Sequence, residues 1–304
     1  MEPAQGAART ILDSTSVHHR EGSLRVPGGF DLFVQSWAPD LPEAVVVLVH
    51  GFAEHSGRHE SAALHLAHEG YAVQSFDLRG HGRSQGKRCF VRVFNEYLDD
   101  AAALLSEAER RWPGKQMFLV AQSLGGLIAS LCVIDGRFEL SGMILSAPAA
   151  KLGSDYSAFK IGASLALGRV LPHLPMFRLR SSSICSNPAV VRAFEEDELV
   201  YHGRTPARTA SEIVRAIRRL QTNAERIHTP TLVMHGGRDQ VADIDGSQTL
   251  YERIGSSDKT LRVYEGLWHE VMHEPESDMV LREMTDWLRE RTNRSVGGRS
   301  QPSN

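Results

Sequence analysis

Short apolar runs alternate with longer amphipathic stretches through most of this chain. Continuous apolar runs, many of them β-branched, predict strands that are covered on both faces. The stretches between them repeat apolar residues at helical spacing and predict helices. The alternation predicts an α/β fold with a mostly parallel central sheet flanked by helices. The predicted strands cover residues 44–49, 71–76, 118–121, 142–148, 231–236 and 261–264, and the predicted helices cover 60–69, 95–111, 124–132 and 277–291.

Two regions depart from this alternation. Residues 18–37 show alternating polarity around Pro27-Gly28-Gly29 and predict two further strands joined by a turn. Residues 149–224 contain no convincing central strand and instead carry helical apolar patterns that include Ile161 and Leu165. We interpret this segment as a helical cap inserted after the sixth strand. The predicted organisation is an α/β core at 17–148 and 225–292, the cap at 149–224, and flexible ends at 1–16 and 293–304.

The run from Phe118 to Ile128 contains a small-x-Ser-x-Gly turn between an apolar strand and an apolar helix, with Ser123 at its centre. This is the context of the nucleophile elbow of α/β-hydrolases. Such a turn exposes the serine hydroxyl at a helix N-terminus, where free N–H groups favour developing negative charge. Ala121 stands where the first small residue is usually glycine, so we expect a slightly looser elbow.

Two further polar residues lie just beyond predicted strand ends. Asp239 follows strand 231–236 and His269 follows strand 261–264. Parallel strands end at one edge of the sheet, and the order Ser, Asp, His is that of an α/β-hydrolase. We therefore predict a catalytic triad of Ser123 as nucleophile, His269 as base and Asp239 as its acid partner. Asp243 is an alternative acid, and His273 is an alternative base that we interpret instead as a pocket residue.

A His-Gly pair follows the central strand 44–49 and leads into a loop at the same edge. The backbone N–H groups of Phe52 in this loop and of Leu124 after the serine are the predicted oxyanion donors. Glu54 and Arg58 are candidates to face the alcohol half of a substrate, although loop-bracing roles fit them equally well. His50 itself is interpreted as a structural residue that braces the loop.

Composition narrows the class of protein. The 304 residues are 41% hydrophobic and 23% charged with a net charge of −3, which is ordinary for a globular protein and gives no electrostatic footprint for nucleic acid. Three cysteines without CxxC spacing favour a reducing compartment over a disulfide framework or zinc site. Residues 1–20 lack the apolar core of a signal peptide, so we expect a cytoplasmic protein. The predicted chemistry needs no metal or organic cofactor.

Several blocks together resemble the monoacylglycerol lipase (lysophospholipase-like) branch of the α/β-hydrolases. They are residues 50–58, with the sequence HGFAEHSGR, residues 77–84, the elbow and the Glu265-Gly266-x-x-His269 segment. The resemblance covers about residues 20–290 and implies a helical cap, an apolar acyl tunnel and a polar pocket for glycerol. It supports Glu54 and Arg58 as pocket residues. Ala121-Gln122 stands where that family usually has Gly-His.

The function expected from these observations is hydrolysis of carboxylic esters through an acyl-Ser123 intermediate. The resemblance implies a small lipid ester as substrate, most naturally a monoacylglycerol with a medium or long acyl chain. The cap's apolar content would allow transient contact with membranes or micelles. Two alternatives remain open at this point: a broader esterase or lysophospholipase of the same fold, and a hydrolase scaffold that binds a ligand without turnover.

Overall fold

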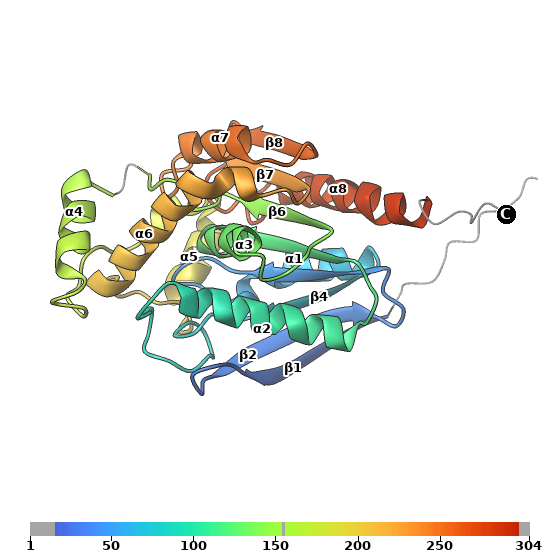
Figure 1. The fold of residues 1–304 in the computed structure, drawn as a ribbon, viewed down its shortest axis with the longest axis horizontal. Coiled ribbons are helices and arrows are strands. Elements are labelled where there is room, and N and C mark those ends of the chain that lie inside the picture. The colour runs from blue at the N-terminus through green and yellow to red at the C-terminus, as the bar shows by residue number, and fades with distance from the viewer. Residues whose placement is uncertain (1–15, 154–155, 298–304) are drawn as a thin grey trace, which may run out of the picture.

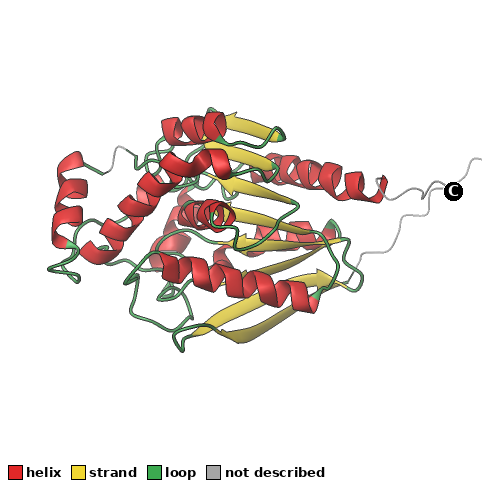
Figure 2. Cartoon of the chain, in the orientation of Figure 1, coloured by secondary structure: helices red, strands yellow, loops and turns green. Residues whose placement is uncertain are grey.

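The computed structural model describes residues 16–153 and 156–297, which are built around an eight-stranded sheet (Figures 1 and 2). The strand order is β1-β2-β4-β3-β5-β6-β7-β8, and β2 runs antiparallel to both of its neighbours. The six strands β3 to β8 are mutually parallel, so their carboxyl ends share one edge. The bounds are β1 Val17–Arg25, β2 Asp31–Pro39, β3 Ala44–Val49, β4 Tyr71–Phe76, β5 Met117–Gln122, β6 Gly142–Ser146, β7 Thr231–Gly236 and β8 Lys259–Tyr264.

Helices cover both faces of the sheet, and the side chains of β3 show why. Val45, Val47 and Val49 belong to the hydrophobic core shared with α2, α3 and α7, whereas Val46 and Leu48 belong to the core shared with α1 and α8. A continuous apolar strand is therefore buried on both faces. The helices are α1 Glu60–His68, α2 Asn95–Arg111, α3 Leu124–Ile134, α4 Ala158–Leu167, α5 Pro188–Glu196, α6 Ala207–Asn223, α7 Ile244–Arg253 and α8 Ser277–Gly297.

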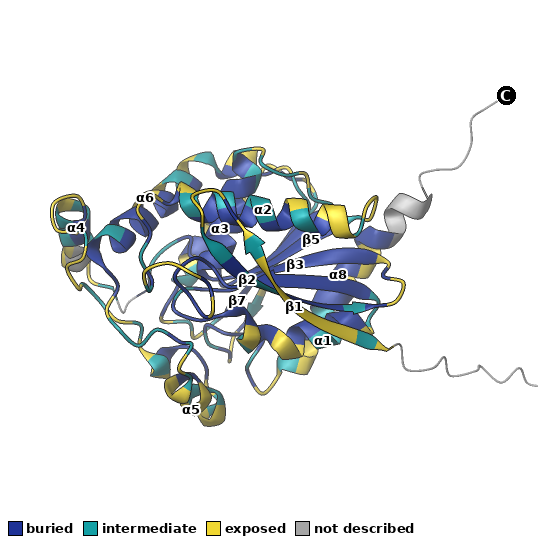
Figure 3. Ribbon diagram, turned by 90° about the horizontal axis from the view of Figure 1, so that it is seen from below, coloured by how far each residue is buried: buried dark blue, intermediate teal, exposed yellow. Residues whose placement is uncertain are grey.

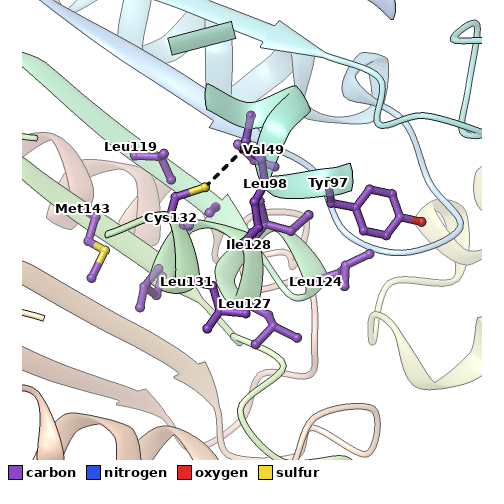
Figure 4. Close-up of a cluster of buried hydrophobic side chains, with 14 of the residues drawn as sticks. Val49, Tyr97, Leu98, Leu119, Leu124, Leu127, Ile128, Leu131, Cys132 and Met143 are labelled. Carbon is purple, nitrogen blue, oxygen red and sulfur yellow. Dashed lines mark hydrogen bonds between the residues drawn. The ribbon is translucent and has the colours of Figure 1, made fainter. Parts of the chain in front are cut away.

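Helix α3 is apolar on nearly every side because it is enclosed between the sheet and α2. Figure 4 shows Leu127 and Ile128 of this helix among side chains from the sheet and from α2, including Val49 and Leu98. The thiol of Cys132 donates to the carbonyl oxygen of Leu98 at 3.8 Å. Helix α3, which begins directly after the elbow serine, is thus held in place by close packing along its length.

The segment between β6 and β7 forms the cap. Helix α6 packs against α3 and α4 packs against α6, while α5 lies apart on the other side of the cap (Figures 1 and 3). The outer faces of α4 and α5 are exposed, whereas the central strands are buried (Figure 3). Among the described residues, a group of exposed large hydrophobic side chains lies on α4 and the turn after it: Phe159, Val170, Leu171 and Leu174.

The predicted α/β-hydrolase architecture is confirmed, including the helical insertion after the sixth strand. Two details differ from the predictions. Helix α7 was not predicted, because its buried face consists of Gly246, Ser247 and Leu250 and so leaves little apolar periodicity in the sequence. Helix α8 runs to Gly297, past the predicted end at Arg291, since no strong helix breaker precedes the Gly-Gly pair. Of the predicted flexible ends, 1–16 and 293–304, residues 1–15 and 298–304 lie outside the described residues, whereas residues 293–297 belong to α8.

Candidate active site

Ser123 sits at a strained turn between β5 and α3. Its backbone has φ 51° and ψ −112°, in the left-handed half of the map that non-glycine residues rarely adopt. The turn is held on both sides: the N–H of Ser123 donates to the carbonyl oxygen of Ser146 at 2.9 Å, and its own carbonyl oxygen accepts from Ala149 at 3.0 Å. These bonds come from the end of β6 and the residues just after it. The neighbouring strand therefore helps to hold the strained conformation in place.

Glycines allow the chain to close around this turn. A Cβ atom on Gly125 would lie 2.3 Å from the carbonyl oxygen of Val49, so only glycine lets α3 start this close to β3. A Cβ atom on Gly51 would lie 3.2 Å from the Cβ of Ser123, which shows how near the loop after β3 approaches the serine. Ala121 is fully buried in β5 and is accommodated without a glycine.

His269 and Asp239 are hydrogen-bonded to each other at the same edge of the sheet. The Nδ1–H of His269 donates to Oδ2 of Asp239 at 2.7 Å. Oδ1 of Asp239 accepts from the backbone N–H groups of Val241 and Ala242 at 2.7 and 3.0 Å. The alternative acid, Asp243, instead caps α7 and forms an ion pair with Lys151. The geometry therefore pairs His269 with Asp239.

The environment of this pair favours the charged form of each partner. Burial by itself raises the pKa of Asp239, but the two adjacent imidazoles and their hydrogen bonds lower it well below its ordinary value. Burial by itself lowers the pKa of His269, but the charge and hydrogen bond of Asp239 outweigh this and raise it. A proton taken up by His269 is thus stabilised by the carboxylate beside it.

The residue before Ser123 links the elbow to the loop that carries His269. The side-chain amide of Gln122 donates to the backbone carbonyl oxygen of His269 at 3.1 Å. Ser123 and His269 line the same cavity, together with Phe52 and Leu124. All five of the residues expected at the chemical centre, Ser123, His269, Asp239, Phe52 and Leu124, are therefore gathered at the carboxyl edge of the sheet.

The loop after β3 is held by its own polar groups. His50 donates from Nδ1 to the carbonyl oxygen of Gly51 at 2.7 Å and accepts at Nε2 from the N–H of Leu78 at 2.9 Å. Burial lowers the pKa of His50 to about 3, so this imidazole stays neutral and braces the loop, as its sequence position indicated. Oε1 of Glu54 accepts from the N–H of Gly51 at 2.5 Å. The peptide that presents Phe52 is fixed from two directions.

A buried ionic cluster lies behind this loop. Arg58 donates from Nη1 to Glu54 and Glu270, at 2.7 Å each, and from Nη2 to the second oxygen of Glu270, also at 2.7 Å. Glu54 and Glu270 line the cavity, and Glu270 directly follows His269. The planar guanidinium also lies over the ring of Phe194 from α5, 4.7 Å from its centroid. The cluster joins the oxyanion loop, the histidine loop and the cap.

The remaining wall of the cavity is largely apolar. The empty volume between the cavity walls is about 750 Å³, including the solvent-filled mouth. One side is formed by cap residues and the other by the core. The apolar residues of the wall are Ala149, Leu152, Tyr156, Phe177, Leu179, Ile184, Phe194, Ala210, Ile213, Val241 and Ala242.

The structure corrects four expected pocket residues. Arg58 is turned away from the cavity wall because two buried carboxylates bind it. His273 does not line the cavity either, since its Nε2 bonds the carbonyl oxygen of Arg58 at 2.7 Å. Ile161 and Leu165 lie on α4, which packs on α6 rather than over the serine, and they are absent from the lining.

Three residues of the site escaped the sequence reasoning. Gln122, whose oxygen Oε1 is buried with no partner among the described residues, was noted only as a departure from a family pattern. Glu270 was overlooked although it follows His269. His235 lies four residues before Asp239, and its Nε2 is 3.2 Å from Oδ2 of Asp239. The available signal was nearness in sequence: Gln122 and Glu270 are adjacent to predicted catalytic residues, and His235 lies four residues before one.

This fold, with an elbow serine and a His–Asp pair at the carboxyl edge of the sheet, defines the class of protein as an α/β-hydrolase. A family model described as serine aminopeptidase, S33, matches residues 40–276, and the chain belongs to this family.

Relatives of known activity share nearly the whole length of the chain. It is 35% identical over 279 residues to a monoacylglycerol lipase of Mycolicibacterium smegmatis, covering 91% of this chain and 99% of that protein. It is 31% identical to a human monoglyceride lipase, covering 89% of this chain and 90% of the relative. The crystal structure of a monoacylglycerol lipase from Paleococcus ferrophilus matches with a TM-score of 0.77 at 30% identity, covering 86% of this chain and 99% of that one.

Proposed function

We propose that this chain is a serine hydrolase that cleaves carboxylic esters, with monoacylglycerols of medium or long acyl chain as its substrates. The observation that carries the proposal is the Asp239–His269 hydrogen bond beside a strained Ser123 in one shared cavity. A hydroxyl at such a turn, with an imidazole oriented by a buried carboxylate, is the arrangement used for acyl transfer.

In the proposed mechanism His269 removes the proton of Ser123 as its oxygen attacks the ester carbonyl. Asp239 holds the imidazole in the required tautomer and stabilises its protonated form. The oxyanion of the tetrahedral intermediate lies between the N–H groups of Phe52 and Leu124, each worth about 3 kcal/mol of barrier. His269 then returns the proton to the departing alcohol. In the second half-reaction His269 removes a proton from water as the water oxygen attacks the acyl carbon, and it returns that proton to Ser123 as the acid leaves.

The substrate assignment rests on the two kinds of wall. The apolar residues from the cap and core suit an acyl chain, whereas Glu54 and Glu270 supply hydrogen-bond acceptors for the hydroxyl groups of a small alcohol. The relatives named as monoacylglycerol lipases agree with this division. None of the helices in the described part of the chain has the length and hydrophobicity to cross a membrane. We propose a cytoplasmic enzyme that meets its substrate transiently at membranes or micelles through the cap.

The test is a comparison of the wild type with Ser123→Ala. We expect the wild type to hydrolyse monoacylglycerols and to be labelled by a fluorophosphonate, and the variant to lose both properties while keeping its circular dichroism spectrum. Initial rates on monoacylglycerols of graded chain length, against triacylglycerols and phospholipids, then define the substrate class. Turnover by purified Ser123→Ala would remove this serine from the mechanism, and an unlabelled wild type would leave a ligand-binding scaffold.

A further inference from the structure

The loop that carries His269 is tied to the strand that leads into Ser123 by one hydrogen bond. Residues 265–276, between β8 and α8, belong to no helix or strand, and we call them the base loop. Within this loop the backbone carbonyl oxygen of His269 accepts from the side-chain amide of Gln122 at 3.1 Å. Gln122 is the last residue of β5 and directly precedes Ser123. One side chain therefore joins the backbone of the predicted base to the strand of the predicted nucleophile.

The direction of this side chain follows from the alternation along β5. Phe118 and Val120 belong to the core on the side of α1 and α8, whereas Ala121 belongs to the core on the other side. Successive side chains of a strand point to opposite faces, so Gln122 points to the face of Phe118 and Val120. The base loop contributes Leu267 to that same core. Gln122 thus reaches the base loop from below, and it is not among the described residues that line the catalytic cavity.

The bond from Gln122 holds one edge of a rigid group. The carbonyl oxygen of His269 and the N–H of Glu270 belong to the same planar peptide. That N–H donates to the carbonyl oxygen of Ile184, in the cap, at 2.8 Å. The core therefore holds one edge of the peptide and the cap holds the other, while the imidazole is bonded to Asp239. Together the three bonds fix both the backbone and the ring of His269.

The chain keeps this bond although the other half of the amide is unsatisfied. Gln122 is 2% exposed, and its Oε1 is buried with no hydrogen-bond partner among the described residues. A backbone carbonyl oxygen only accepts hydrogen bonds, so the amide nitrogen faces His269 and Oε1 faces away from it. A buried acceptor without a partner destabilises the folded state. The position that the amide gives His269 therefore explains this residue better than stability does.

We propose that Gln122 is a positioning residue, whose amide N–H holds the peptide of His269 so that the imidazole stays aligned with Ser123. This inference rests on the proposed ester hydrolysis. A displacement of about 1 Å at a reacting group can slow an enzyme about 10²-fold. Because Gln122 lies outside the cavity wall, its loss should slow the chemical steps and leave substrate binding unchanged. The donor should therefore control kcat and not KM.

The first test is Gln122→Met, which keeps the length of the side chain and removes its donor. We expect kcat for a soluble ester to fall by about tenfold or more, with KM within about twofold of the wild type. The midpoint of urea unfolding should change little, because the variant loses one hydrogen bond and also one unsatisfied acceptor. A wild-type kcat combined with a lowered urea midpoint would assign Gln122 a structural role and overturn the proposal.

Gln221→Met is the matched control. The side-chain amide of Gln221 also donates to a backbone carbonyl oxygen, that of Ala150 at 2.8 Å, but this bond lies outside the base loop. The control variant should have a lower urea midpoint and a kcat within about twofold of the wild type. If both glutamine variants lost kcat equally, the loss would not be specific to the base loop, and the proposal would fail.

The second test, Gln122→Glu, makes the donor depend on pH. A carboxyl group of the same shape donates to the carbonyl oxygen of His269 only while it is protonated, and burial raises its pKa. The ratio of kcat for this variant to kcat for the wild type should therefore be highest at about pH 6 and fall as the pH rises. A variant as slow as Gln122→Met at pH 6, or a ratio that rises with pH, would contradict the role of the donor.

A measurement without substrate keeps this inference distinct from the proposed function. The Nδ1 proton of His269, bonded to Asp239, should give a downfield NMR signal that His269→Gln identifies by its loss. We expect a sharp signal in the wild type and in Gln221→Met, and a signal broadened by exchange with water in Gln122→Met. If the wild type hydrolyses no ester, the hydrolase proposal fails, and the signal still decides whether Gln122 holds His269. If the wild type is active and Gln122→Met keeps both its kcat and the sharp signal, the positioning proposal fails and the hydrolase proposal stands.

Discussion

Asp239 accepts three hydrogen bonds and lies 3.2 Å from a further imidazole nitrogen, and this environment distinguishes it from Asp243, the other acid that the sequence offered. Both oxygens of Asp239 are engaged at the end of β7, and one of them faces His269. Asp243 is partly exposed and serves a helix cap and a surface ion pair. Two aspartates only four residues apart therefore have different roles, and the one whose carboxylate points at His269 is the candidate triad acid.

We therefore expect Asp239→Asn to lower kcat by a factor of about 10⁴, because an amide at this position favours the wrong imidazole tautomer. Asp243→Asn should lower kcat less than threefold and cost less than about 1 kcal/mol of stability, because asparagine caps helices as well as aspartate and only the surface ion pair with Lys151 is lost. Steady-state kinetics with one soluble ester and urea unfolding of both variants make the comparison. Equal losses of kcat in the two variants would reject Asp239 as the triad acid.

His235 gives the acid a second imidazole partner. Its Nε2 faces Oδ2 of Asp239 and the carbonyl oxygen of Ala242, both at 3.2 Å, so this nitrogen carries the proton. Nδ1 lies 2.7 Å from the hydroxyl oxygen of Ser247. The same carboxylate oxygen thus serves His235 and His269. The N–H of His235, 3.2 Å from this oxygen, reduces the negative charge available to stabilise protonated His269.

The pH dependence of kcat/KM reports on this arrangement. The pKa of His269 is raised above its ordinary 6.5, so activity should fall as the pH drops through a midpoint above that value. In His235→Leu the carboxylate loses a donor, and we expect the midpoint to rise by about 0.5 to 1 pH unit, equivalent to about 1 kcal/mol. His235→Gln retains an amide donor and should restore the wild-type midpoint. A lower rate in His235→Leu with an unmoved midpoint would assign this residue a purely structural role.

At the scale of the element, the junction between β5 and α3 depends on the absence of a side chain. Gly125 lies against the carbonyl oxygens of Val49 and His50, so the start of α3 is pressed onto the end of β3. We expect Gly125→Ala to destabilise the protein by about 3 kcal/mol and to reduce activity, because the added methyl must push backbone apart. Chemical unfolding and esterase assays measure the two effects.

Gly162 provides the matched control. It lies on the exposed side of α4, and a Cβ atom there would have no neighbour within 4 Å. Gly162→Ala should stabilise the helix by about 0.5 to 1 kcal/mol and leave catalysis unchanged. If Gly125→Ala were as harmless as this control, close packing would not explain the glycine of the elbow.

The elements themselves were largely predictable, because a strand covered on both faces leaves a continuous apolar run in the sequence. The polar residues just beyond the strand ends were predictable as a group, because a parallel sheet places the carboxyl ends of its strands at one edge. Their catalytic roles stay predictions, although the structure brings Ser123, Asp239 and His269 together. Which residues line the cavity was not predictable: the cap wall includes Phe177 and Leu179, which belong to no helix or strand.

Arg58 illustrates what sequence patterns cannot show. Its main partner, Glu270, is 212 residues away along the chain, and neither residue belongs to a periodic pattern that would mark it as buried. The direction of the arginine side chain follows from the tertiary contacts of both carboxylates. Only the assembled molecule shows that a residue expected in the substrate pocket stabilises the loops around it.

At the scale of the whole molecule this ion cluster joins the two halves of the core to the cap. One nitrogen of Arg58 lies 2.7 Å from both carboxylates, so without the cation two buried negative charges would face each other. In the wild type, burial raises the pKa of Glu54, but His59 and Arg58 lower it well below its ordinary value. That pairing stabilises the fold above the pKa of the unfolded carboxyl and is lost as the pH falls.

Arg58→Gln should reverse this dependence. The uncompensated carboxylates would take up a proton on folding, which raises their folded pKa, so stability should decrease as the pH rises through that value. We expect a loss of about 3 to 5 kcal/mol, larger at pH 8 than at pH 5, in urea unfolding. Arg253→Gln removes an exposed pair with Glu225 and should cost less than about 1 kcal/mol at either pH. A loss in Arg58→Gln that does not vary with pH would contradict this account.

The chain enters and leaves the cap at nearly the same place. The side-chain amide of Gln221, near the end of the insertion, donates to the carbonyl oxygen of Ala150, near its beginning, at 2.8 Å. The N–H of the neighbouring Ala149 donates to the carbonyl oxygen of Ser123. An insertion whose ends meet can lengthen, shorten or be replaced without altering the strand register beneath it. Evolution can therefore graft a new selectivity onto an unchanged reaction centre, and a laboratory chimaera joined at these residues could exchange preferences between relatives in one step.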